Sequence, residues 1–66
     1  MTARELSHFI DKEVVHFDRR YHERSVYILR GIKKDAATGK RYTILQDISV
    51  KNSYVKARIE DIERAE

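Results

Sequence analysis

The chain has 66 residues and no cysteine, and it carries a formal net charge of +3. A chain of this length holds one domain and buries only about 60% of the surface that its unfolded form exposes, so its core is a single cluster. Without cysteine it has no disulfide framework and no thiolate zinc site, and no apolar run approaches the roughly 20 residues of a membrane span. We therefore expect one cytoplasmic domain, residues 1–66.

The first residues predict a short helix. Thr2 and Glu5 have the spacing of a capping box, in which the hydroxyl accepts from a backbone N–H and the carboxylate bonds back. Apolar residues follow at helical spacing: Leu6, Phe9 and Ile10. We expect a helix over about residues 3–12. It is too short to be stable alone, so its apolar side must dock on the rest of the chain.

Three later segments predict strands, because they are rich in β-branched and aromatic residues. They are residues 13–17, 25–32 and 41–45. The second segment alternates most clearly. One face of it would carry Val26, Ile28 and Ile32, and the other Tyr27, Leu29 and Gly31.

The segments between these strands predict turns. Residues 18–24 are polar and charged and predict a turn or loop. Residues 35–39 predict a tight turn, in which Asp35 bonds to backbone donors ahead of it and Gly39 supplies a positive φ. Ile48 and Val50 extend the third strand or begin another, and residues 51–53 predict a second hairpin turn.

The end of the chain, residues 53–65, fits two structures. Val55, Ala57 and Ile59 alternate as in a strand, whereas Val55, Ile59 and Ile62 also have the i, i+4, i+7 spacing of a helix. Two fold classes therefore stay open. The first is a mainly β domain with a short N-terminal helix and a strongly bent small barrel. The alternative is an α+β domain, a three-stranded antiparallel sheet with N- and C-terminal helices.

Two stretches carry a resemblance to a known family. Leu29-Arg-Gly-Ile-Lys-Lys-Asp35 and then Tyr42-Thr-Ile-Leu-Gln-Asp47 combine a glycine at which a strand can bend, an acidic turn and an apolar strand. This is similar to the Sm1 pattern of Sm-like proteins. Val55-Lys-Ala-Arg-Ile-Glu-Asp-Ile62 resembles the Sm2 end, and also the chain ends of the bacterial YolD-like group. The resemblance implies a five-stranded Sm/SH3-like small barrel.

Two features depart from the Sm-like pattern. Lys56-Ala-Arg58 stands where the bacterial Sm-like RNA chaperone has a Lys-His pair, so no functional residue is carried over. Only four residues follow Ile62, which leaves little chain for a fifth strand. In the Sm-like family that strand supports the closed barrel and the ring assembly.

The residues predict neither catalysis nor a bound cofactor or metal. The three histidines are His8, His16 and His22, and no two of them have the i, i+4 spacing that would face one metal. Ser7 adjoins His8 only in sequence, and the chain has neither a Gly-x-Ser-x-Gly elbow nor a glycine-rich phosphate loop. The carboxylates of residues 60–63 are expected to be the solvated side of a turn or helix.

The most suggestive functional region is basic. Residues 19–41 hold eight basic and two acidic residues, a net charge of +6, and the remainder sums to −3. Arginine pairs with phosphate, and tyrosine offers a flat face on which a base can stack. The other interpretation is a solvated charged loop, with Tyr27 and Tyr42 as ordinary sheet residues. The candidate nucleic-acid-binding residues are Arg19, Arg20, Tyr21, Arg24, Lys33, Lys34, Lys40 and Arg41.

The sequence therefore predicts a small, non-catalytic regulatory or accessory binding module. Its expected partner is RNA or single-stranded DNA, held on a basic face. The alternative is a protein–protein interaction module, in which an edge strand or the helix face binds a partner protein or a second copy, giving a homo-oligomer. No membrane association is expected.

Overall fold

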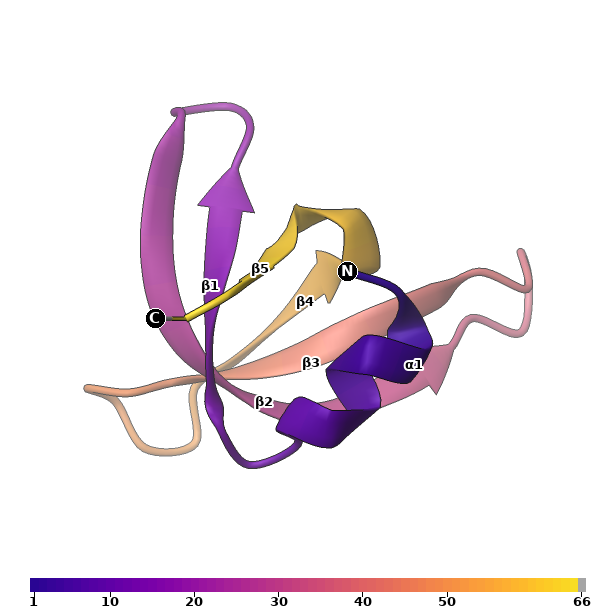
Figure 1. Ribbon diagram of the computed structural model, residues 1–66, viewed down its shortest axis with the longest axis horizontal. Coiled ribbons are helices and arrows are strands. Elements are labelled where there is room, and N and C mark those ends of the chain that lie inside the picture. Colours follow the sequence, from indigo (N-terminus) through magenta and orange to yellow (C-terminus); the bar gives the residue numbers. More distant parts are fainter. Residues whose placement is uncertain (66) are drawn as a thin grey trace.

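The computed structural model describes residues 1–65, which form a mainly β fold with a short helix at the N-terminus (Figure 1). The helix is α1 (Ala3–Leu6), and the 3-10 turn η1 (Ser7–Phe9) continues it. The strands are β1 (Glu13–Asp18), β2 (Glu23–Lys34), β3 (Arg41–Asp47), β4 (Tyr54–Arg58) and β5 (Ile62–Arg64), with the 3-10 turn η2 (Ile59–Asp61) before β5. The mainly β prediction is confirmed, and the alternative with a C-terminal helix is wrong.

The N-terminal helix begins at the predicted capping box. The Glu5 N–H donates to the Thr2 hydroxyl at 3.2 Å, and the Thr2 N–H donates to the Glu5 carboxylate at 3.1 Å. The helix is shorter than predicted, because α-helical geometry gives way to a 3-10 turn after Leu6 and the chain reverses at Asp11, where φ is +68°. Leu6 is fully buried, so the helix docks as expected.

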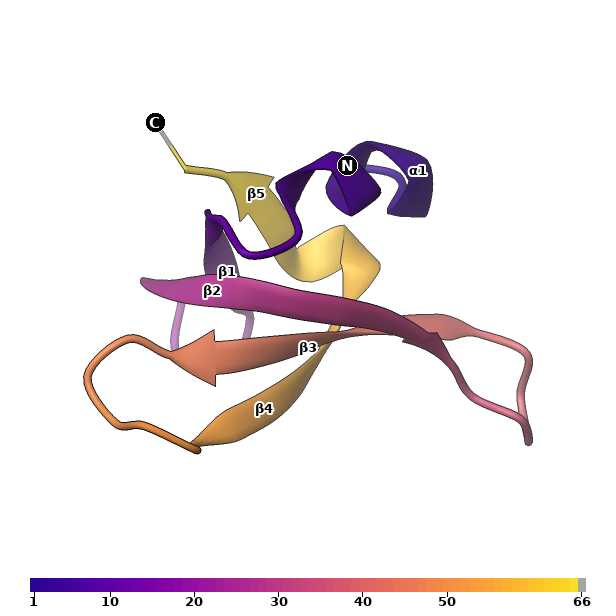
Figure 2. The same cartoon turned by 90° about the horizontal axis from the view of Figure 1, so that it is seen from below.

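The strands form one antiparallel sheet in the order β4-β3-β2-β1-β5. The long β2 bends, so that its first half rises with β1 while its second half lies with β3 and β4; α1 and β5 lie over this second layer (Figures 1 and 2). Among residues 1–65 no ladder joins β4 to β5, so the sheet is open. The three residues of β5 suffice to pair with β1, which corrects the expectation that too little chain remained for a fifth strand.

A β-bulge changes which residues of β2 face the core. Leu29 lies opposite Leu45 and Gly31 opposite Ile44, so Arg30 is an extra residue in the ladder. Ile32 then lies opposite the buried Thr43, on the same side as Leu29. The prediction that Ile32 shares a face with Val26 and Ile28 is wrong, because simple alternation contains no such extra residue.

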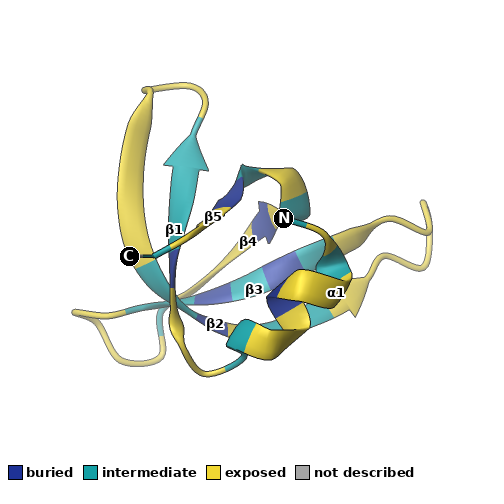
Figure 3. Ribbon diagram, in the orientation of Figure 1, coloured by how far each residue is buried: buried dark blue, intermediate teal, exposed yellow. Residues whose placement is uncertain are grey.

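The core is one small cluster beneath the helix. Its buried apolar members are Leu6, Val14, Leu29, Leu45, Ala57 and Ile62. Figure 3 shows these positions gathered where α1 and β5 cover the middle of the sheet, whereas the hairpin tips are exposed. Thr43 is the buried polar residue, and its hydroxyl donates to the Ala57 carbonyl at 2.9 Å. This bond ties β3 to β4 within the core.

The turns predicted at residues 35–39 and 51–53 are confirmed, and the turn predicted at residues 18–24 is limited to residues 19–22, between β1 and β2. The Gly39 N–H donates to the Asp35 carbonyl at 2.7 Å, and the Asp35 carboxylate accepts from the Ala37 N–H at 2.8 Å. The loop between β3 and β4 closes through the Asp47 N–H, which donates to the Ser53 carbonyl at 2.9 Å. Ile48 and Val50 lie in this loop and extend no strand.

Gly39 offers a direct test of the β2–β3 turn. Gly39→Ala is expected to lower the free energy of unfolding by about 1 kcal/mol, since φ is +71° there and a Cβ strains that backbone conformation. Space is not the cause, because the nearest heavy atom, Lys34 Cε, would lie 4.0 Å from the new Cβ. Gly31→Ala is the control, with no heavy atom within 4 Å of its Cβ. Equal losses for both variants in urea denaturation would contradict this account.

Candidate nucleic-acid interface

The structure divides the eight predicted site residues between two hairpins. Arg19, Arg20, Tyr21 and Arg24 lie at the β1–β2 hairpin, and Lys33, Lys34, Lys40 and Arg41 lie at the β2–β3 hairpin. The long β2 joins these hairpins, whose tips point in different directions in Figure 1. The eight residues therefore form two separate groups, and the prediction of one continuous basic region is wrong.

The β1–β2 group is largely neutralised by carboxylates from the end of the chain. Arg19 Nε donates to Asp61 Oδ1 at 2.7 Å, and Arg24 Nε donates to Glu63 Oε1 at 2.8 Å. The Arg24 guanidinium also lies 4.8 Å from the centre of the Phe17 ring. These contacts fasten η2 and β5 to the β1–β2 hairpin, so both arginines have structural partners.

The ion pairs lower the pKa of both carboxyl groups. Partial burial alone would raise the pKa of Asp61, but hydrogen bonds from Arg58 and Arg19 outweigh it, and the pKa lies below its ordinary value of 3.8. The hydrogen bond from Arg24 lowers the pKa of Glu63. In both cases the folded state favours the charged carboxylate.

These shifts predict that acid weakens the fold. Because the pKa of Asp61 is lower in the folded chain than in the unfolded chain, its contribution to stability is present above pH 3.8 and is lost as pH falls through the folded value. Asp61→Asn should therefore lower stability at neutral pH and flatten its dependence on pH below about 4. Urea denaturation over a pH series measures both effects. An unchanged pH dependence in Asp61→Asn would contradict the assignment.

The β2–β3 end gathers cations from four parts of the chain. We define the basic belt as Arg4, Lys33, Lys34, Lys40, Arg41 and Arg58. Arg4 comes from α1, Arg58 ends β4, and the other four flank the β2–β3 turn. Within residues 1–65, Arg58 is the one belt residue in an ion pair, 3.2 Å from Asp61 and 3.5 Å from Glu60. Arg4 and Arg58 could not be assigned to this group from the sequence, because only folding brings them to the hairpin.

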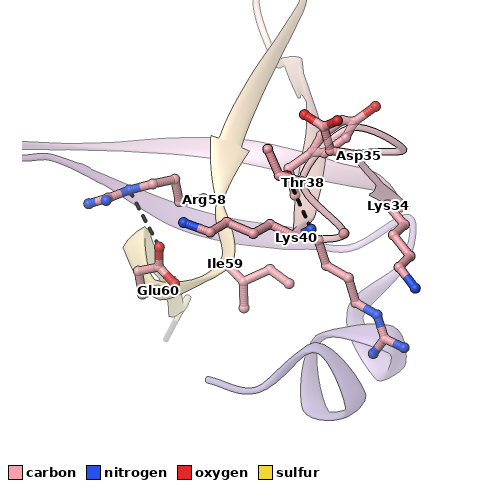
Figure 4. Close-up of a pocket in the computed structure, with 10 residues that line it drawn as sticks. Lys34, Asp35, Thr38, Lys40, Arg58, Ile59 and Glu60 are labelled. Atoms are coloured by element: carbon pink, nitrogen blue, oxygen red, sulfur yellow. Dashed lines mark hydrogen bonds and ion pairs between the residues drawn. The ribbon is translucent and has the colours of Figure 1, made fainter.

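An open groove of about 830 Å³ lies between the β2–β3 hairpin and η2, and we call it the η2 groove. Its lining residues are Lys34, Asp35, Thr38, Gly39, Lys40, Arg41, Tyr42, Arg58, Ile59 and Glu60. In Figure 4 the Lys40 side chain extends across the groove toward Arg58. Tyr42 is its one aromatic side chain, and the Lys56 ammonium lies 5.2 Å from the centre of that ring.

A second groove, of about 600 Å³, lies between α1 and the same hairpin, and we call it the α1 groove. It is lined by Ala3, Arg4, Ser7, Ile32, Lys33, Lys34 and Arg41. Four of these side chains are basic, and none of them is a carboxylate. The α1 groove therefore offers an anion a purely positive lining.

Lys34 and Arg41 line both grooves. They also lie directly opposite each other in the β2–β3 ladder. Like charges at directly opposed positions destabilise an antiparallel pair. The arrangement is therefore poor for stability and favourable for holding a negatively charged partner.

The three tyrosines that interleave with the basic region have different positions. Tyr42 lies opposite Lys33 in one ladder and opposite Arg58 in the other, so it accompanies the belt. Tyr21 lies at the β1–β2 tip and is 64% exposed. Tyr27 packs against the core cluster, with His16 edge-on to its ring. Only Tyr42 is placed to help the belt hold a base.

Comparisons of the chain with models of protein families, with curated proteins and with solved structures found no match. The resemblance to Sm-like barrels therefore stays a prediction. None of the helices in residues 1–65 has the length and apolar character needed to cross a membrane. In the same residues no three His, Cys, Asp or Glu side chains are grouped so that they would hold a metal ion.

Proposed function

We propose that the chain is a small, non-catalytic binding module that holds RNA or single-stranded DNA at the basic belt. The observation that carries the proposal is the opposed Lys34 and Arg41, two cations that line both grooves and have no ion pair within the described residues. Phosphates of a nucleic-acid backbone would supply the missing negative charge.

The chemistry of the belt suits a flexible strand. Lysine and arginine bind phosphate, arginine often through two parallel hydrogen bonds. Tyr42 adds an aromatic face beside these cations, and base–aromatic stacking is open to the unpaired bases of a single strand. A cationic groove with an aromatic platform is the combination that single-strand binding proteins use.

Fluorescence polarisation with labelled RNA and single-stranded DNA tests the proposal. Affinity is expected to fall steeply as salt rises, since each phosphate neutralised on a single strand contributes about −0.7 to the slope of log K against log [salt]. Four to six belt contacts predict a slope of roughly −3 to −4. Absence of binding to either strand at the lowest salt would refute the proposal.

A second candidate function, protein–protein interaction, is favoured by one separate observation. Residues 1–65 have six exposed large apolar side chains, and four of them fall within residues 48–55 of the β3–β4 hairpin. They are Ile48, Val50, Tyr54 and Val55. The strand that begins there, β4, is an edge of the sheet and can accept another strand.

For this candidate, a partner protein fits the charges better than a second β4. Antiparallel pairing of β4 with its own copy, centred on Lys56, would oppose two lysines. Sedimentation at several concentrations, with Val50→Lys as the comparison, tests self-association. A concentration-dependent dimer that Val50→Lys abolishes would establish it, and a monomer throughout would leave only a partner protein.

A further inference from the structure

We infer that the two grooves have different roles: the α1 groove binds a backbone phosphate and the η2 groove binds the base of an adjoining nucleotide. This inference rests on the proposed function and gives the strand a path across the base of the β2–β3 hairpin. The ligand it names is a nucleotide unit with a neighbouring phosphodiester, presented by a single strand.

The charges of the two linings separate the roles. The α1 groove has four basic side chains and no carboxylate, so only attraction acts on a phosphate there. The η2 groove also has four basic side chains, but the carboxylates of Asp35 and Glu60 offset two of them, so a phosphate is attracted less strongly there than in the α1 groove. Carboxylates accept hydrogen bonds from base amino groups and from sugar hydroxyls, and they discriminate against phosphate.

Of the two grooves, one has an aromatic ring in its lining. Tyr42 lines the η2 groove and is half-buried, and the α1 groove has no aromatic lining residue. The Lys56 ammonium lies 5.2 Å from the centre of the Tyr42 ring, so one face of the ring is in contact with a cation. A base that stacks on this face displaces the ammonium, which then remains available to a phosphate of the same strand.

Lys34 and Arg41 make the two grooves one site. Directly opposed residues of neighbouring antiparallel strands have Cα atoms about 4.5–5.5 Å apart, and this pair lines both grooves. A strand that leaves one groove therefore meets two cations before it enters the other. Arg19 and Arg24, which are already paired with carboxylates, lie outside this path.

The test compares one variant in each groove on two probes. Arg4→Ala removes a phosphate contact from the α1 groove, and Tyr42→Leu removes the ring from the η2 groove while keeping an apolar side chain in the strand. The probes are a labelled single-stranded DNA and the same strand made abasic, which keeps its phosphates and lacks its bases. Arg20→Ala, at the opposite hairpin, is the control with the same loss of charge as Arg4→Ala.

On the normal strand, Arg4→Ala is expected to make the salt slope shallower by about 0.7, as one lost phosphate contact requires. Tyr42→Leu is expected to weaken binding about tenfold to hundredfold with an unchanged slope, because stacking is not ionic. On the abasic strand, Tyr42→Leu should bind like the unaltered chain, whereas Arg4→Ala should still be weaker. Circular dichroism checks that each variant is folded.

Each contrary result has one meaning. If the salt slope of Arg4→Ala is unchanged, no phosphate binds in the α1 groove. If Tyr42→Leu weakens binding to the normal and the abasic strand equally, no base binds in the η2 groove. In these two cases the unaltered chain still binds, and the proposed function stands. If the unaltered chain binds neither probe, the proposed function fails and this inference fails with it.

Discussion

Lys34→Glu is expected to weaken nucleic-acid binding at least tenfold while raising the free energy of unfolding. Lys34 lines both grooves, so the substitution removes one cation and introduces one anion where the strand would cross. In the folded chain the introduced carboxylate would oppose Arg41 across the β2–β3 ladder. Replacing a like-charge pair by an opposite-charge pair should add about 0.5–1 kcal/mol of stability.

Arg20→Glu is the matched control for Lys34→Glu. It changes the net charge by the same amount on an exposed side chain at the β1–β2 hairpin. At physiological salt, charges act over only about 8 Å, so binding should stay within about threefold of the unaltered chain. Polarisation assays and urea denaturation on the same samples measure affinity and stability together. Equal losses of affinity would mean that net charge, and not the belt, drives binding.

Lys34→Glu is expected to lower affinity and to raise stability. These opposite signs distinguish a residue that serves binding from one that serves the fold. A residue kept for the fold loses stability and function together when it is changed. Breaking the opposed pair of Lys34 and Arg41 by Lys34→Glu is instead expected to stabilise the chain while binding is lost, as is common where a site carries uncompensated charge. If Lys34→Glu both destabilises the chain and leaves binding intact, the pair has another role.

Local features of the fold followed from the sequence where a few neighbouring residues determine them. The capping box at Thr2 and Glu5 formed, and so did the turn between Asp35 and Gly39. Each depends on bonds between residues two to four positions apart. The prediction of which side of the sheet carries Ile32 was wrong, because the bulge at Arg30 depends on pairing with β3 and leaves no local pattern in the sequence.

The candidate site was predicted only in part, for a related reason. The group of Lys33, Lys34, Lys40 and Arg41 was found, since a short hairpin brings these residues together whatever the rest of the fold does. The partners of Arg19 and Arg24 lie 42 and 39 residues away, so charge counting along the chain could not show that they are neutralised. Arg4 joins the belt only because α1 docks beside β2.

Leu45→Ala is expected to remove a large share of the stability of the fold. Leu45 is fully buried at the centre of β3, opposite Leu29 on one side and Val55 on the other. Truncating a buried leucine costs about 2–5 kcal/mol, from lost apolar burial and from the cavity that remains. At roughly 0.05–0.15 kcal/mol per residue, a chain of this size has only about 3–10 kcal/mol to lose. Circular dichroism and urea denaturation give the size of the loss.

Two further variants test whether the loss comes from the burial and the volume of the Leu45 side chain. Ile48→Ala removes a similar apolar side chain that is 49% exposed in the adjoining loop, and it should cost less than about 0.5 kcal/mol. Leu45→Met keeps the volume and should cost less than about 1.5 kcal/mol. Residues 1–65 have one buried cluster with six apolar members, so no second core among them can compensate for the loss of one. If Leu45→Ala lowered the free energy of unfolding no more than Ile48→Ala, β3 would not be the centre of the core. The position of the basic belt would then not depend on the packing of β3, at whose start Arg41 lies.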